Sequence, residues 1–481
     1  MTLPAGYSIT TLASEDRGPE TELEVGGLSV RPDGTVLAST RHGELWAFDP
    51  GSGEWSLRTD ELHQTLGVWT GGGPGDAAND IWVVQKPELT RLVDDTDAPT
   101  IDAFETVCDE WGYSGDFFEF AYGPVRDSEG NFHLNLSLGA EGGGPCTSVQ
   151  IYSAPWRGWH VRVTPEGEFQ PYAKGLRSPL GLGINADDEV FYSDVQGDWV
   201  PVCHVSRIVE DAFYGHPHSL GPDPDWPDYE NLCEGVESEY AERFREARKP
   251  PVAWIPYELA ESAAGVTFEE KGAFGPFEGQ AFLGDQRNAS LVRLAMEAVN
   301  GRYQGAVFPF SDPGDFQCGN VVEAFSADGS ALYVGQTDRG WGSAGTEAYG
   351  VQRVEYDGAT TPFAMHSIAV LPSGFRIDFT KAAAGEAGSP DSYEVSRWTY
   401  NYHSTFGSGR VNETDVEVTN ASVVDGGSAV ELELPEVGPA TVSEDLTVRG
   451  RVYEISADVT ADDDSEMAHD TGWYTVHEVP G

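Results

Sequence analysis

The segment Gly27–Asp49, GLSVRPDGTVLASTRHGELWAFD, contains the pattern that decides the fold. It reads as a strand, an Asp-Gly turn, a second strand, a polar loop and a third strand, because short apolar runs alternate with turn residues. Similar copies recur at Asp80–Asp94, Phe120–Gly139, Leu180–Trp199, Ala264–Met296 and Val321–Trp341. One such unit cannot bury both of its faces alone, so six copies predict a six-bladed β-propeller.

The sequence on either side of the repeats completes an all-β architecture. We expect the strand Tyr7–Leu12 to pair into the last blade, which gives a propeller over residues 1–362. An insertion at 218–260, between the fourth and fifth blades, contains a predicted helix at Glu237–Lys249. Residues 363–481 alternate polar and apolar side chains with period two, which predicts a small C-terminal β-sandwich followed by a tail.

The charge balance is extreme, with 80 Asp and Glu against 28 Lys and Arg and a net charge of −52. The acids are spread along the chain, which is typical of a protein adapted to molar salt, where the Debye length is only about 3 Å. We therefore expect a halophilic archaeon as the source. Such a field repels polyanions and excludes a nucleic-acid binder. No apolar run approaches the roughly 20 residues that membrane insertion requires.

The N-terminal residues show neither a basic segment nor an apolar one, so no signal peptide is visible. We expect the cytoplasm of a halophile that accumulates salt, or export if a leader has been removed. The sequence does not indicate an oligomeric state.

In a propeller, ligands bind over the central channel, beside the loops at one end of the blades. The residues that follow the second strand of each copy should share this rim. They include Arg41, Lys86, Asp194, Gln196, Gly197, Asp198, Asp285, Gln286, Thr337, Asp338 and Arg339. In a chain so poor in cations, Arg and Lys at matching positions indicate a small ligand whose oxygens they bind.

The stretch Gly175–Pro217, GLRSPLGLGINADDEVFYSDVQGDWVPVCHVSRIVEDAFYGHP, resembles the soluble quinoprotein glucose/sorbosone dehydrogenase superfamily, and the closer match is an uncharacterised branch of it. The segments KGAFGPFEGQAFLGDQ and VGQTDRGWGSAG extend the resemblance over nearly the whole chain. It implies a six-bladed propeller that oxidises a sugar-like alcohol or aldehyde, with pyrroloquinoline quinone as hydride acceptor and Ca²⁺ as its Lewis-acid partner.

The resemblance also implies roles for individual residues. Arg177 matches the quinone-contacting arginine, and Gly197 matches a carbonyl ligand of calcium, so Asp194, Gly197 and Asp198 are the predicted metal ligands. The predicted cofactor-binding residues are Arg41, Lys86, Arg177, Gln196, Gln286, Thr337 and Arg339. Ser178 stands where the family has Asn, and the family's histidine before Tyr122-Gly123-Pro124 is absent. The catalytic candidates are therefore Asp194, Asp285, Asp338 and Glu119.

Two other functions fit the same residues. Asp194, Asp285 and Asp338 occupy equivalent rim positions and would supply three ligands to the divalent ion of a metal-dependent lactonase or sugar hydrolase. Alternatively, the propeller and sandwich form a non-catalytic module that binds a carbohydrate or a protein.

Overall fold

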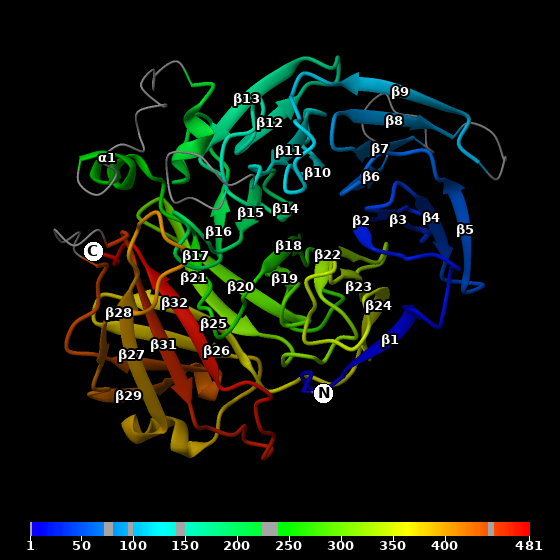
Figure 1. Cartoon of the computed structure of the whole chain (residues 1–481). Coiled ribbons are helices and arrows are strands. Elements are labelled where there is room, and N and C mark those ends of the chain that lie inside the picture. Colours follow the sequence, from blue (N-terminus) through cyan, green and yellow to red (C-terminus); the bar gives the residue numbers. More distant parts are fainter. Residues whose placement is uncertain (1, 72–79, 95–99, 141–149, 224–238, 441–446) are drawn as a thin grey trace.

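The computed structural model describes every residue except 1, 72–79, 95–99, 141–149, 224–238 and 441–446. Antiparallel sheets are arranged in a ring, and the C-terminal strands lie together at one side of it (Figure 1). The innermost strands are β2 (Val25–Val30), β6 (Val68–Thr70), β10 (Ala121–Arg126), β14 (Gly181–Ile184), β18 (Ala263–Phe268) and β22 (Asn320–Phe325). Each begins a sheet whose strands follow one another outward.

The second strand of each sheet is buried on both faces, since it lies between neighbouring sheets. These strands are β3 (Val36–Thr40), β7 (Ile81–Val84), β11 (Phe132–Leu136), β15 (Val190–Asp194), β19 (Ala281–Asp285) and β23 (Ala331–Thr337). The third strands are β4 (Leu45–Asp49), β8 (Leu89–Val93), β12 (Trp159–Val163), β16 (His204–Arg207), β20 (Ser290–Val299) and β24 (Tyr349–Tyr356). The fourth are β5 (Glu54–Thr59), β9 (Ala103–Cys108), β13 (Phe169–Lys174), β17 (Ala253–Trp254), β21 (Arg302–Pro309) and β1 (Tyr7–Ala13).

The N-terminal strand closes the ring as predicted. β1 pairs antiparallel with β24, with Tyr7 opposite Tyr356, so the first strand of the chain completes the sheet of β22, β23 and β24. The predicted helix is also present as α1 (Glu239–Ala247), and residues 237 and 238 of the prediction lie outside the described residues. Short 3₁₀ turns occur at η1 (Pro217–Leu220), η3 (Gly385–Gly388), η4 (Pro390–Ser392) and η5 (Asp425–Gly427).

The C-terminal strands form two facing groups. One sheet comprises β25 (Met365–Leu371), β26 (Gly374–Phe379), β30 (Ala429–Glu433) and β29 (Asn420–Val424). The other continues the sheet of β18–β21 through β32 (Thr471–Val476), β31 (Arg451–Ala457), β27 (Tyr393–Thr399) and β28 (Val411–Asp415). Because β32 pairs directly with β21, the chain's last strand joins the ring to the C-terminal region.

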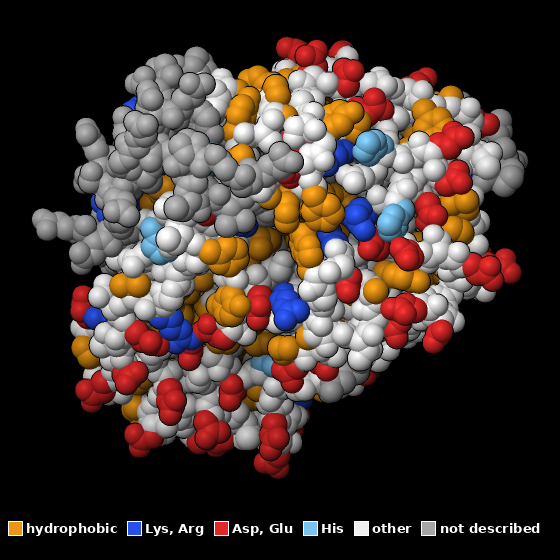
Figure 2. Space-filling view, viewed as in Figure 1, with side chains coloured by type: hydrophobic (Ala, Val, Ile, Leu, Met, Phe, Trp, Pro, Cys, Tyr) orange, Lys and Arg blue, Asp and Glu red, His pale blue; other side chains and the backbone are white. Residues whose placement is uncertain are grey.

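The described residues contain no helix long and apolar enough to cross a membrane. Carboxylate side chains lie mainly around the edge of the face in Figure 2, whereas hydrophobic side chains gather near its centre with Lys and Arg beside them. On the face shown in Figure 2, most carboxylates therefore lie away from the centre.

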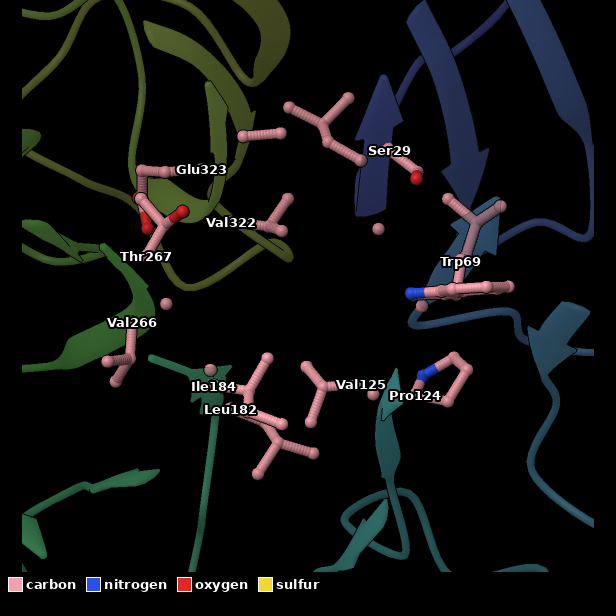
Figure 3. A pocket seen from close by; sticks show the side chains of 18 of the residues that line it. Ser29, Trp69, Pro124, Val125, Leu182, Ile184, Val266, Thr267, Val322 and Glu323 are labelled. Atoms are coloured by element: carbon pink, nitrogen blue, oxygen red, sulfur yellow. The ribbon is translucent and has the colours of Figure 1, made fainter. Parts of the chain in front are cut away.

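The six innermost strands enclose a central cavity of about 320 Å³ (Figure 3). The strands approach closely: a Cβ on Gly67 would lie 1.2 Å from the Gly123 carbonyl oxygen, so only glycine fits there. The carboxyl group of Glu323, on β22, packs against Gly265, and neither oxygen has a hydrogen-bond partner of normal geometry among the described residues. Burial raises the pKa of Glu323 well above its usual range.

We expect the buried carboxyl group of Glu323 to make the free energy of unfolding depend on pH. Between its unfolded pKa of about 4.3 and its higher folded pKa, the folded chain retains a proton that the unfolded chain has lost, so stability falls as pH rises. We expect Glu323→Gln to reduce this slope by up to about 1.4 kcal/mol per pH unit. Guanidinium chloride unfolding from pH 5 to pH 8 measures it, and an unchanged slope would contradict the assignment.

Candidate functional site

The rim at the ends of the second strands is stabilised by a repeated hydrogen-bond arrangement. In two sheets, an aspartate at the end of the second strand accepts backbone N–H groups from the loop before the innermost strand. Asp194 accepts from Arg177 at 2.9 Å and Ser178 at 2.7 Å. Asp285 accepts at 3.0 Å from each of Glu261 and Ser262. These carboxylates therefore fix the shape of the rim loops.

The hydrogen bonds of Asp194, Asp285 and Asp338 do not suit the metal-binding role that the sequence suggested for them. Burial raises the pKa of Asp194 to about 6 despite the two backbone donors, and it also raises the pKa of Asp285. Asp338 is half-buried and accepts from the Gly340 backbone at 2.7 Å, as in a turn. No three His, Cys, Asp or Glu side chains gather into a metal-binding group within the part of the chain that the structure describes. Asp194, Asp285 and Asp338 therefore do not form a common metal centre there.

Arg177 is the residue around which the buried charges are organised. Its Nε donates to Asp198 Oδ1 at 2.8 Å, and its Nη1 donates to the Gln196 carbonyl at 3.0 Å. Asp198 Oδ2 also lies 3.1 Å from His216 Nε2. Burial alone would raise the pKa of Asp198, but His216 and Arg177 hold it well below its usual range.

The three predicted calcium ligands do not fit a calcium ion in this arrangement. A Cβ on Gly197 would lie 2.0 Å from Arg177 Cζ, so the guanidinium group occupies the space beside this glycine. Asp198 is already paired with that guanidinium, and both oxygens of Asp194 accept backbone hydrogen bonds. The positive charge at this position is supplied by Arg177.

Next to Arg177 lies a cavity of about 320 Å³, which we call the rim pocket. Four predicted cofactor-binding residues line it: Arg177, Gln196, Gln286 and Arg339. Its polar lining also includes Gln150, Ser178 and Ser262. The Gln286 Oε1 and Arg339 Nε atoms are buried and have no hydrogen-bond partner within the described ranges, so they remain available to a ligand.

Aromatic rings form the other part of the rim pocket. Phe118 and Trp341 are stacked, with centroids 5.4 Å apart and planes 18° from parallel. The Arg339 guanidinium lies 4.8 Å from the Phe120 ring centroid. Arg177 lies 5.6 Å from the ring of Phe406, a residue that is 60% exposed. Flat apolar faces combined with two guanidinium groups suit a planar, anionic ligand.

The other predicted site residues lie outside the lining of the rim pocket. Arg41 pairs with Glu24, and the Lys86 ammonium donates to the Asp116 carbonyl oxygen. Burial lowers the pKa of Lys86. Thr337 Oγ1 accepts from the Arg339 backbone at 2.9 Å, so it supports the turn that carries this arginine.

Glu119, the predicted substitute for the missing histidine, is fully buried. Its carboxylate accepts from the Ser114 backbone at 2.6 Å, from the Gly115 backbone at 3.2 Å and from the Ser153 hydroxyl group. Burial opposes ionisation, but the Ser153 and Ser114 donors and the nearby Arg157 guanidinium together hold the pKa of Glu119 below its usual value. A carboxylate bound in this way stabilises a loop and is poorly placed to remove a proton from a ligand.

The sequence did not predict the aromatic residues that line the rim pocket, nor the hydrogen bonds that hold Arg177 in place. Three of the aromatic residues had a visible signal, since Phe118 and Phe120 lie in the run FFEF and Trp341 lies in DRGWG. Phe406 had none, because it comes from the C-terminal region: Gly407 donates a backbone hydrogen bond of 3.0 Å to Gly197 and places its neighbour at the pocket.

No protein-family model matches the sequence, and no curated protein sequence is significantly similar to it. Solved structures are similar in fold. An oxidoreductase of Thermus thermophilus, described as a glucose dehydrogenase, is 18% identical with a TM-score of 0.52, covering 73% of this chain and 100% of its own. The PQQ-bound aldose sugar dehydrogenase of Streptomyces coelicolor is 17% identical with a TM-score of 0.50, covering 73% and 99%. The chain thus has a nearly all-β fold with propeller-like neighbours.

Proposed function

We propose that the chain binds pyrroloquinoline quinone in the rim pocket and is a sugar-dehydrogenase-like oxidoreductase. The observation that carries this proposal is the convergence of Arg177, Arg339, Gln196 and Gln286 on one cavity with stacked aromatic walls. The quinone is planar and carries carboxylates and carbonyl oxygens, so it requires both kinds of surface. The quinone bound in the Streptomyces coelicolor neighbour supports the same ligand class.

The residues present fit such a group. Arg177 and Arg339 would donate charge-assisted hydrogen bonds to its anionic oxygens, and the amides of Gln196 and Gln286 would donate to its carbonyl groups. Phe118, Phe120 and Trp341 would cover its ring faces and exclude water from one side. When bound, the quinone supplies a two-electron acceptor for oxidation of an alcohol or aldehyde group.

The chain's own residues would hold and orient the ligand. Asp198 fixes the Arg177 guanidinium from behind, and the Tyr122 hydroxyl accepts from Arg339 Nη1 at 3.0 Å. Both guanidinium groups are therefore held in place before a ligand arrives, which reduces the entropy lost on binding. Phe406, which is 60% exposed, lies at the solvent side of the pocket, and a small sugar-like substrate would enter from there.

We further propose a six-bladed β-propeller over residues 1–362, with an insertion at 218–260, and a C-terminal β-sandwich over 363–481. The six innermost strands around one cavity and the two C-terminal groups of strands support this division. The outer strand β17 comes from the end of the insertion. The dispersed carboxylates support an origin in a halophile, so binding experiments belong in molar KCl.

Equilibrium titration with pyrroloquinoline quinone, followed by quenching of tryptophan fluorescence, tests the proposal. We expect saturable binding by the wild type and a loss of about 10- to 100-fold in affinity for Arg339→Gln, since a charged hydrogen bond contributes about 1.5–3 kcal/mol. Arg287→Gln is the matched control, because Arg287 is on the same rim, 53% exposed, and does not line the pocket. Absence of saturable binding by the wild type, or equal affinity in both variants, would reject the proposal.

The activity itself is tested by dye reduction with a panel of aldoses and aldehydes, using protein loaded with the quinone. We expect reduction only with both quinone and sugar present. Binding of the quinone without turnover would support the assignment of the ligand but reject the oxidoreductase activity. The lactonase alternative has less support, since the three aspartates it needs accept hydrogen bonds from loop backbone.

A further inference from the structure

A third cavity, of about 280 Å³, lies at the other end of the strands from the rim pocket. Its lining includes Arg207, Lys249, Arg302 and Tyr303. Arg207 is opposite Phe191 near the start of β15, whereas the rim residue Asp194 ends that strand. Arg302 closes the β20–β21 hairpin opposite Val299, at the other end from the Asp285–Ser290 pair on the rim. The two cavities therefore lie at opposite ends of the blades.

The charge of this cavity is exceptional for the chain. Three of only 28 Lys and Arg residues line it, in a protein with a net charge of −52. Arg207 is paired with Glu189 at 2.9 Å. Arg302 lies 3.9 Å from Glu478, and the side chains of Arg302 and Glu478 are each about 40% exposed. Arg207 therefore has a counter-ion at hydrogen-bond distance, whereas the exposed ion pair of Arg302 is long and weak.

Lys249 has no compensating partner among the described residues. Its backbone is fixed, since its N–H donates to the Phe213 carbonyl oxygen at 2.7 Å. Among the described residues, its side-chain ammonium has no ion pair or hydrogen bond, and the charged groups that act on it are the cations Arg207 and Arg302. Burial lowers the pKa of Lys249, and repulsion from Arg207 and Arg302 lowers it further. An anion in the cavity would offset both costs.

We propose that Lys249, Arg302 and Arg207 form a binding site for a small oxyanion, either inorganic phosphate or a phosphate ester. Three cations that converge from separate elements supply several charge-assisted donors, which a multivalent oxyanion uses better than chloride does. The cavity is slightly smaller than the range for small-molecule sites, about 300–1,000 Å³, which suits a ligand as small as an oxyanion. This site is independent of the quinone proposal, because none of its residues lines the rim pocket.

Isothermal titration calorimetry in molar KCl at pH 7.5 tests the site with two probes, inorganic phosphate and glucose 6-phosphate. We expect saturable binding of at least one probe by the wild type, and the tighter probe identifies the source of the anion. Lys249→Gln and Arg302→Gln should each lower its affinity about tenfold or more, equivalent to about 1.4 kcal/mol. Arg17→Gln, which removes an exposed cation elsewhere, should bind like the wild type.

Circular dichroism and thermal unfolding show that each variant is folded. Arg302→Gln alters a half-exposed hairpin residue, so it keeps the test valid if Lys249→Gln fails to fold. Two results would overturn the proposal: neither probe binds the wild type, or both folded variants bind as tightly as the Arg17→Gln control.

Discussion

Replacing Gly197 with alanine is expected to lower the affinity for pyrroloquinoline quinone by about 10- to 100-fold. The added Cβ would lie 2.0 Å from Arg177 Cζ and 2.2 Å from its Nε, so the guanidinium must move. Movement breaks its hydrogen bonds to Asp198 and the Gln196 carbonyl and removes a charged donor from the pocket, a loss of about 1.5–3 kcal/mol. The fluorescence titration described above measures the change.

The matched control is Gly409→Ala, in the segment that reaches the rim from the C-terminal region. An added Cβ there meets no heavy atom within 4 Å, so the same chemical change should leave quinone affinity at the wild-type value. If Gly197→Ala also binds like the wild type, Arg177 is not the cation that the ligand uses.

The substitution Asp198→Asn should reduce the free energy of unfolding by about 3–5 kcal/mol, because it leaves a buried guanidinium without its counter-ion. Asp198 accepts from Arg177 Nε at 2.8 Å and lies 3.1 Å from His216 Nε2, and its side chain is fully buried. Guanidinium chloride unfolding of the wild type and the variant measures the difference.

The pH dependence of this effect follows from the direction of the pKa shift. The pKa of Asp198 is lower in the folded chain, so its contribution is complete above the unfolded pKa of about 3.9 and is lost as pH falls through the folded value. The deficit of Asp198→Asn should therefore be constant above about pH 7.5, where His216, whose pKa is lowered by burial, is neutral in both the folded and the unfolded chain. Asp462→Asn, at an exposed aspartate, should stay within about 0.5 kcal/mol of the wild type. An equal change in both variants would mean that the buried ion pair contributes nothing specific.

Much of the fold could be predicted because each unit repeats a local pattern of strands and turns. The segment Gly27–Asp49 yields β2, β3 and β4, and the N-terminal strand pairs with β24 as expected. The first strand of the second unit has no clear signal in the sequence, since β6 is only Val68–Thr70. The pairing of β32 with β21 was also missed, because no local pattern indicates which edge a distant strand joins.

The candidate site was predictable in part for the same reason. Alignment of the repeats placed Gln196, Gln286 and Arg339 on one rim, and the family resemblance added Arg177; the structure brings all four to the rim pocket. The alignment did not distinguish a side chain that points into the pocket from one that bonds its own loop. Asp194 and Asp285 belong to the second kind, because hydrogen bonds to backbone N–H groups depend on loop geometry rather than on residue type.

A crystal structure of the protein soaked with pyrroloquinoline quinone in molar KCl tests the central claim most directly. We predict density for the quinone in the rim pocket, with its anionic oxygens within hydrogen-bond distance of Arg177 and Arg339 and its ring against Phe118, Phe120 or Trp341. Density for the quinone elsewhere, or a rim pocket without it at a concentration that saturates the fluorescence titration, would contradict the account.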